Sequence, residues 1–242
     1  MKKRRILVFG CSKAGKTSML NTITGQEMEV SDAAVGTTLD TQRYEQFIYN
    51  GKSYQFIDTA GLDEGTVSNE DVIKNVIKFV ENEAEGFNLF VMVIAKSVIS
   101  RTVEKNYELF IKHIKTKEIP TLCVVTRCEN DDPLNKWVVE NKWNFENRYG
   151  IKFNNMIGSC FAQEWTGRFG ETYKELCEES KEKVMDMIEK TCSETPHTII
   201  QEGMLETFKR IMKAIFGDVK TDEFIMNLGQ ALFPGSGHSL YK

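Results

Sequence analysis

Short apolar runs alternate along the chain with longer segments in which apolar residues recur every three or four positions. The short runs predict strands over 4–9, 42–49, 53–57, 88–95, 121–126 and 155–159. The longer segments predict helices over 16–24, 69–83, 103–116, 134–147 and 173–192. This alternation is typical of an α/β fold, in which a mostly parallel sheet is covered by helices on both faces.

Asn50 and Gly51 separate the second and third predicted strands. This dipeptide favours a tight hairpin, so we expect these two strands to be antiparallel. The prediction is therefore a three-layer domain with a six-stranded sheet and one antiparallel edge strand.

The pattern changes after Pro196. Apolar residues recur at helical spacing to Phe216, and a second short amphipathic stretch covers 224–233. We expect a main domain over 1–195, a helical extension over 196–233 and a flexible tail over 234–242. The extension either packs on the main domain or docks on a membrane surface or a protein partner.

Composition narrows the classes of function. The chain has 242 residues and a net charge of -4, which gives no electrostatic reason to expect nucleic acid. Six cysteines occur without a C-x-x-C pair, the apolar run 89–95 is too short to span a membrane, and the first residues do not resemble a signal peptide. We expect a cytoplasmic protein.

Residues 10–17 match the phosphate-binding pattern G-x-x-x-x-G-K-[ST] and follow the first predicted strand directly. The two glycines permit a bend that brings backbone N–H groups onto a diphosphate, Lys16 can reach the β- and γ-phosphates, and the Thr17 hydroxyl can bind Mg²⁺. The residues expected at the phosphates are Gly10, Cys11, Ser12, Lys13, Ala14, Gly15, Lys16, Thr17 and Ser18.

Two further segments predict the metal site and the γ-phosphate contact. Asp58 ends a predicted strand and can hold Mg²⁺, while the backbone N–H of Gly61 can approach a γ-phosphate. Thr38, with Thr37 as the alternative, can complete the metal coordination when the γ-phosphate is present. We expect Thr17, Thr38 and Asp58 as metal ligands, and Lys16, Thr38 and Gly61 as catalytic residues.

A base-recognition segment follows the buried strand 121–126. Thr126-Arg127-Cys128-Glu129 approximates the pattern [NT]-K-x-D, in which a carboxylate accepts hydrogen bonds from guanine. Glu129 supplies that carboxylate and Arg127 can stack on the base as a planar cation. We also expect a backbone contact to guanine O6 near Ser159 and Cys160.

The order of these motifs is similar to that of the Ras-like, translation-factor-related GTPases. Residues 58–62, 67–73 and 86–93 also resemble the immunity-associated nucleotide-binding proteins (the GIMAP or IAN group), relatives of septins and chloroplast import receptors. The resemblance covers about residues 4–165. It implies a GTPase that binds GTP or GDP with Mg²⁺ and pairs through its nucleotide face as a GTP-dependent homodimer or oligomer.

The chain departs from the Ras-like pattern at Leu62, where those enzymes have a glutamine that orients water. Leucine has no hydrogen-bonding group, so intrinsic hydrolysis should be slow. Candidates for groups donated across a dimer are Asp63, Glu64, Arg43 and Arg101. Two alternatives stay open: an interaction or scaffold protein whose nucleotide is never hydrolysed, and an ATP-dependent kinase or ATPase.

Overall fold

The structure is a computed structural model that describes residues 2–28, 42–59, 79, 83–162, 170–199 and 213. The chain divides into two compact units, Met1–Ile199 and Ile200–Lys242. Lys213 is the single described residue of the second unit, so the account below concerns the first.

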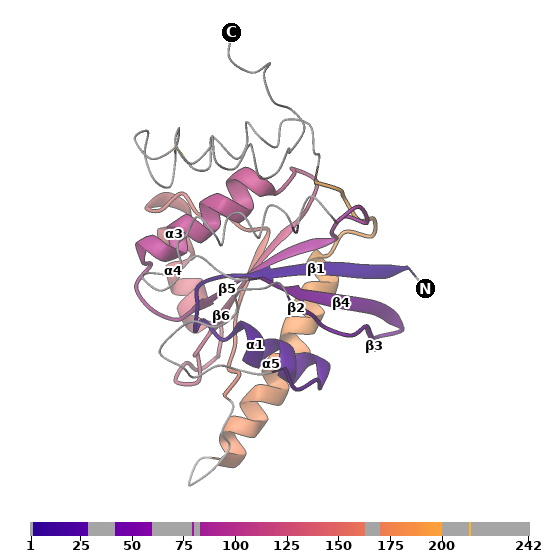
Figure 1. Cartoon of the computed structure of the whole chain (residues 1–242). Coiled ribbons are helices and arrows are strands. Elements are labelled where there is room, and N and C mark those ends of the chain that lie inside the picture. Colours follow the sequence, from indigo (N-terminus) through magenta and orange to yellow (C-terminus); the bar gives the residue numbers. More distant parts are fainter. Residues whose placement is uncertain are drawn as a thin grey trace. The chain divides into compact units, whose positions relative to one another are not determined.

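Seven strands form one twisted sheet in the described part of the chain (Figure 1). They are β1 (Lys3–Phe9), β2 (Gln42–Arg43), β3 (Phe47–Tyr49), β4 (Lys52–Asp58), β5 (Leu89–Ala95), β6 (Thr121–Thr126) and β7 (Asn155–Gly158). Their order is β2-β4-β1-β5-β6-β7, and β3 also pairs with β4. Neighbours from β4 to β7 are parallel, whereas β2 and β3 run antiparallel to β4. The carboxyl ends of the parallel strands therefore share one edge.

Helical segments cover both faces of this sheet. They are α1 (Lys16–Thr24), α3 (Arg101–Tyr107), the π-helical η1 (Glu108–Ile114), α4 (Lys136–Asn147) and α5 (Gly170–Thr191). In Figure 1, α1 and α5 lie on one side of the sheet and α3 lies on the other. The three-layer α/β prediction is confirmed.

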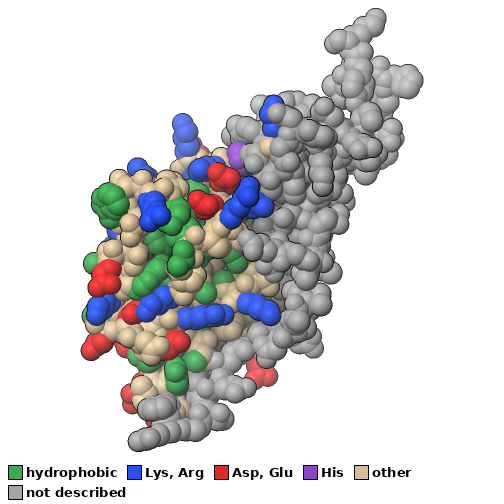
Figure 2. Space-filling view, turned by 90° about the vertical axis from the view of Figure 1, so that its left-hand side faces the viewer, with side chains coloured by type: hydrophobic (Ala, Val, Ile, Leu, Met, Phe, Trp, Pro, Cys, Tyr) green, Lys and Arg blue, Asp and Glu red, His purple; other side chains and the backbone are tan. Residues whose placement is uncertain are grey.

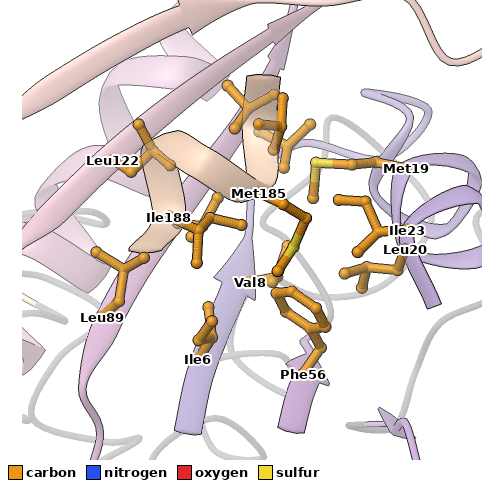
Figure 3. Close-up of a cluster of buried hydrophobic side chains, with 14 of the residues drawn as sticks. Ile6, Val8, Met19, Leu20, Ile23, Phe56, Leu89, Leu122, Met185 and Ile188 are labelled. Atoms are coloured by element: carbon orange, nitrogen blue, oxygen red, sulfur yellow. The ribbon is translucent and has the colours of Figure 1, made fainter. Parts of the chain in front are cut away.

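Side chains along β1 point alternately to the two faces of the sheet, so the strand contributes to a hydrophobic core on each face. Ile6 and Val8 face the layer of α1 and α5, whereas Phe9 stacks on Phe110 of η1 with ring centroids 4.2 Å apart. Figure 3 shows the first core, in which strand residues meet Met19, Leu20, Ile23, Met185 and Ile188 from the two helices. Both faces of β1 are buried from Arg4 onward, and its second half, Ile6–Phe9, is continuously apolar.

The predicted strand over 42–49 is two strands, so the sheet has seven strands rather than six. The interruption lies at Glu45. Its N–H and C=O bond to the side chain of Gln26, at 2.8 and 3.1 Å, instead of continuing the ladder. Tyr44 N–H still donates to Phe56 O at 3.0 Å, so the break is confined to the residues after it.

The helix predicted over 103–116 begins earlier, at Arg101, because the Ser100 hydroxyl caps it by accepting a hydrogen bond from Val103 N–H. It continues as the π-helical η1, in which Lys115 N–H reaches Phe110 O. Of the helix predicted over 69–83, only Phe79 and Glu83 lie within the described residues.

The segment after α5 returns to the sheet. Phe87 and His197 exchange both backbone hydrogen bonds at 2.9 Å, and a Cβ on Gly86 would lie 2.5 Å from His197 O. Residues 196–199, which the sequence assigns to the extension, thus belong to the first compact unit.

The surface of the described residues carries mixed charge. Figure 2 shows apolar, basic and acidic side chains interspersed on one face, so neither sign of charge dominates there. Among the described helices, none combines the length and apolarity that crossing a bilayer requires.

Candidate functional site

The loop over residues 10–17 joins β1 to α1 at the carboxyl edge of the parallel strands. Gly10 has φ of 143°, and a Cβ there would lie 2.0 Å from Val93 O, so only glycine fits against β5. Gly15 has φ of 87° and ends the loop where α1 begins. Lys13 also takes a left-handed conformation, with φ of 58°. The backbone therefore bends as the phosphate-binding pattern predicts.

Lys16 is held at the loop that precedes it. Its side chain is buried, and Nζ donates to the carbonyls of Gly10 and Cys11, both at 3.0 Å. The buried ammonium of Lys16 is thus placed at the phosphate-binding segment. A phosphate oxygen would replace the carbonyls as the acceptor.

Asp58 is the last residue of β4 and is fully buried. Its Oδ2 accepts a hydrogen bond from the Thr17 hydroxyl at 3.3 Å, whereas its Oδ1 is buried without a hydrogen-bond partner among the described residues. Burial raises the pKa of Asp58 to about 6, against the opposing effects of the Lys16 charge and the Thr17 hydroxyl. A spare carboxylate oxygen beside a hydroxyl fits a hard divalent cation, so these residues fit Mg²⁺.

Thr126 and Arg127 connect the base-recognition segment to the phosphate loop. The Thr126 hydroxyl donates to Ala14 O at 2.7 Å, and the Arg127 guanidinium donates to Lys13 O at 2.8 Å. Arg127 reaches the loop from a left-handed backbone conformation, with φ of 64°. The structure therefore brings together two sequence-predicted segments more than a hundred residues apart.

Glu129 is partly exposed and lies in a turn that Asp131 N–H closes by donating to Cys128 O at 2.9 Å. Cys128 N–H in turn donates to Ser159 O at 3.0 Å. This bond places the turn beside the segment that follows β7. The predicted base carboxylate therefore stands at the same edge of the sheet as the phosphate loop.

The backbone N–H groups of Ser159 and Cys160 are both used within the protein. Ser159 N–H donates to Val125 O at 2.7 Å, and Cys160 N–H donates to the Ser180 hydroxyl at 2.8 Å. The predicted contact of these residues with guanine O6 stays a prediction, and this arrangement disfavours it for these two N–H groups.

The remaining predicted site residues lie at the edge of this site or outside the described part of the chain. Ser12 and Ser18 are partly exposed, at the loop and the first turn of α1. Arg43 pairs with Glu83, and Arg101 is exposed at the start of α3. Thr37, Thr38, Gly61, Leu62, Asp63 and Glu64 lie outside the described residues.

The structure adds residues that the sequence analysis missed. Buried Asn106 of α3 lies beside the phosphate loop, with Nδ2 3.7 Å from Cys11 Sγ. Lys96 follows β5 and pairs with Asp131 at 2.6 Å. For Lys96, a charged residue directly after a buried strand was the available signal; Asn106 gave none, since an asparagine within a helix is common.

With this geometry established, comparison with known proteins decides the family. A sequence profile of the family described as 50S ribosome-binding GTPase matches residues 5–127, a little more than half of the chain. The chain belongs to this GTPase family. It is thus a P-loop GTPase, and the ligands of such proteins are GTP or GDP with Mg²⁺.

Individual relatives agree with this family. GTPase Der of Campylobacter fetus subsp. fetus is 29% identical over 168 residues, which are 67% of this chain and 33% of that protein. The tRNA modification GTPase MnmE of Hamiltonella defensa subsp. Acyrthosiphon pisum is 35% identical over 97 residues, which are 40% of this chain and 20% of that protein. The chain thus spans about a third or less of the length of these relatives.

A solved structure confirms the fold. The crystal structure of a variant of Aquifex aeolicus Era bound to GDP and AlF4⁻ matches with a TM-score of 0.57 and 15% identity, and the match covers 87% of this chain and 66% of that one. At this identity the likeness concerns the Ras-like three-layer architecture alone.

Proposed function

We propose that this chain is a Mg²⁺-dependent GTP-binding switch that hydrolyses GTP slowly and self-associates in its GTP form. The observation that carries the proposal is the buried Asp58 carboxylate, which has one oxygen without a partner among the described residues and the other at the Thr17 hydroxyl. Lys16 stands close enough to lower the pKa of that carboxyl, against the effect of burial. A cation bound here would be coordinated by the spare Asp58 oxygen and would contact the phosphates that Lys16 binds.

The slow rate follows from Leu62. Its side chain can neither orient nor polarise an attacking water, so hydrolysis depends on another group. A group from a second copy of the chain would couple hydrolysis to self-association. The resemblance of residues 58–62, 67–73 and 86–93 to the immunity-associated nucleotide-binding group supports the same proposal.

The segment between β5 and α3 supports self-association through the nucleotide face. It begins at the carboxyl end of β5, the strand against which Gly10 packs. Val98 in this segment is 83% exposed, and Arg101, three residues further along the chain, is also exposed. An exposed aliphatic side chain next to a cation suits an interface that forms beside bound phosphate.

Hydrolysis and sizing test this proposal together. The protein is incubated overnight with GTP and Mg²⁺, the nucleotide is separated by chromatography, and samples with GDP or a non-hydrolysable GTP analogue are sized in solution. We expect slow formation of GDP and larger particles with the analogue. Val98→Asp should abolish the larger particles, whereas Ile48→Asp, at a 60% exposed position on β3, should preserve them.

The alternative is an interaction or scaffold protein whose nucleotide is structural. Leu62 is the feature that favours it. The scaffold alternative predicts tight nucleotide binding without any formation of GDP after incubation, and equal particle sizes with both nucleotides. That pair of results would contradict the switch. A cytoplasmic location and a membrane or protein partner for the helices after 199 stay predictions.

A further inference from the structure

Lys96 connects β5 to the turn that carries the base carboxylate. Its backbone N–H donates to Thr126 O at 2.9 Å, which places it beside the first residue of the base-recognition segment. Its Nζ lies 2.6 Å from Asp131 Oδ1. The side chains are only 25% and 11% exposed, so this ion pair is shielded from solvent more than an ordinary surface pair.

Asp131 depends on this lysine. Its Oδ2 is buried without a hydrogen-bond partner in the described part of the chain, so Lys96 is the side-chain partner that balances the carboxylate there. Asp131 also closes the turn that holds Glu129, through the bond from its N–H to Cys128 O. Loss of the ion pair would leave a shielded carboxylate unpaired, and that carboxylate would move the turn toward water.

The same lysine affects Glu129 through charge. The hydrogen bond to Asp131 raises the pKa of Lys96, partial burial opposes this, and the negative charges of Asp131 and Glu129 add to the increase. Two carboxylates in one short turn repel each other, and the Lys96 ammonium at Asp131 offsets that repulsion. The lysine charge thereby helps to keep both carboxylates in this turn.

We propose that Lys96 and Asp131 are positioning residues for guanine recognition: their ion pair holds the Cys128–Asp131 turn so that Glu129 presents its carboxylate to the base. The proposal rests on the proposed guanine site and deepens it. Neither residue belongs to the four-residue base pattern. Their effect is on the choice of base, because the phosphate loop is anchored separately by Thr126 and Arg127.

Titrations with GDP, IDP and ADP in Mg²⁺ test the pair. Inosine lacks the exocyclic amine of guanine, so the GDP-over-IDP affinity ratio reports the contact of the carboxylate with that amine. Lys96→Met keeps the apolar stem and removes the charge. We expect the ratio to fall by about tenfold, the size of one hydrogen bond to a charged group, while the affinity for ADP, which reports the phosphates, stays unchanged.

Asp131→Asn should reproduce the loss, and Lys96→Arg should restore the ratio. Lys112→Met is the matched control, because Lys112 pairs with Glu108 on the surface of η1, and it should leave all three affinities unchanged. Thermal unfolding of each variant without nucleotide identifies changes in folding. Asp131→Asn, which is nearly isosteric, is decisive if Lys96→Met does not fold.

The outcomes separate this inference from the function on which it rests. A wild-type protein without preference for GDP over ADP overturns both. A wild-type protein that prefers GDP and loses that preference in Glu129→Ala, but keeps its GDP-over-IDP ratio in Lys96→Met and Asp131→Asn, overturns the positioning role alone. An equal fall in the affinities for all three nucleotides shows a merely structural pair and also overturns it.

Discussion

The carboxylate of Glu83 forms ion pairs with two arginines from different strands, and its removal should destabilise the fold strongly. Oε2 pairs with Arg5 of β1, and Oε1 pairs with Arg43 of β2. The side chains of Glu83 and Arg5 are 4% and 3% exposed. Arg5 also donates to Gly86 O at 2.8 Å and lies over the Phe87 ring at 5.3 Å. Glu83 therefore neutralises a guanidinium that solvent does not reach.

The magnitude follows from what Glu83→Ala leaves behind. Among the described residues, the buried guanidinium of Arg5 would keep only Glu85 as a charged partner, at 3.5 Å between Nε and Oε2, and Glu85 is 66% exposed. Removing one partner of a buried ion pair costs about 3–5 kcal/mol. Arg43→Ala should cost only about 1 kcal/mol, because Arg43 is 50% exposed and water can replace it.

Urea unfolding of the nucleotide-free protein measures these differences. Glu83→Ala should lower the midpoint by about 1 M or more, given typical urea slopes. The matched control is Glu179→Ala, which removes an exposed pair with Lys183 one turn away on α5 and should cost about 0.5 kcal/mol or less. Equal midpoints for Glu83→Ala and Glu179→Ala would refute the reasoning, since burial would then make no difference.

Two further predictions concern the phosphate loop and the metal ligand. Gly10→Ala should lower the unfolding free energy by about 3 kcal/mol or more, because its Cβ would meet Val93 O at 2.0 Å, and calorimetry should show a much smaller cost for Gly51→Ala, which has positive φ but open space. Burial raises the pKa of Asp58 to about 6 in the metal-free folded state, above its value of about 4 in the unfolded chain. Between these two pH values the folded state holds a proton on Asp58 that the unfolded state has already released. The unfolding free energy should therefore rise as the pH falls from about 6 to about 4, by up to about 3 kcal/mol from this group. Asp58→Asn should remove that increment in urea titrations across this range, and an unchanged pH profile would contradict the burial argument.

Local signals accounted for much of the fold. The helix over 16–24 has the predicted bounds because Gly15 and Gly25 flank it in left-handed conformations, and β6 has the predicted bounds because its whole run is buried. The prediction of one continuous strand over 42–49 was wrong, because the side chain of Gln26, distant in sequence, forms hydrogen bonds with the backbone of Glu45. Such a contact depends on tertiary structure and leaves no periodic signal.

The candidate site shows the same division. The motifs predicted the phosphate loop, Asp58 and the base segment, because each chemistry requires particular residue types at short spacing. The Lys96–Asp131 ion pair and the approach of Asn106 to Cys11 join elements that only the sheet order brings together. Charges and amides of this kind are common on helices and in loops, so their sequence positions alone do not distinguish them.

The most direct test of the guanine-nucleotide site is the affinity of the wild-type protein and of Lys16→Ala for GDP and ADP in Mg²⁺. The account predicts that the wild-type protein binds GDP at least about a hundredfold more tightly than ADP, because the Glu129 carboxylate matches the ring N–H and exocyclic amine of guanine and not the edge of adenine. Lys16→Ala should stay folded and lose both affinities, since Lys16 holds the phosphates. Equal wild-type affinities for GDP and ADP, or an unchanged GDP affinity in Lys16→Ala, would contradict the account.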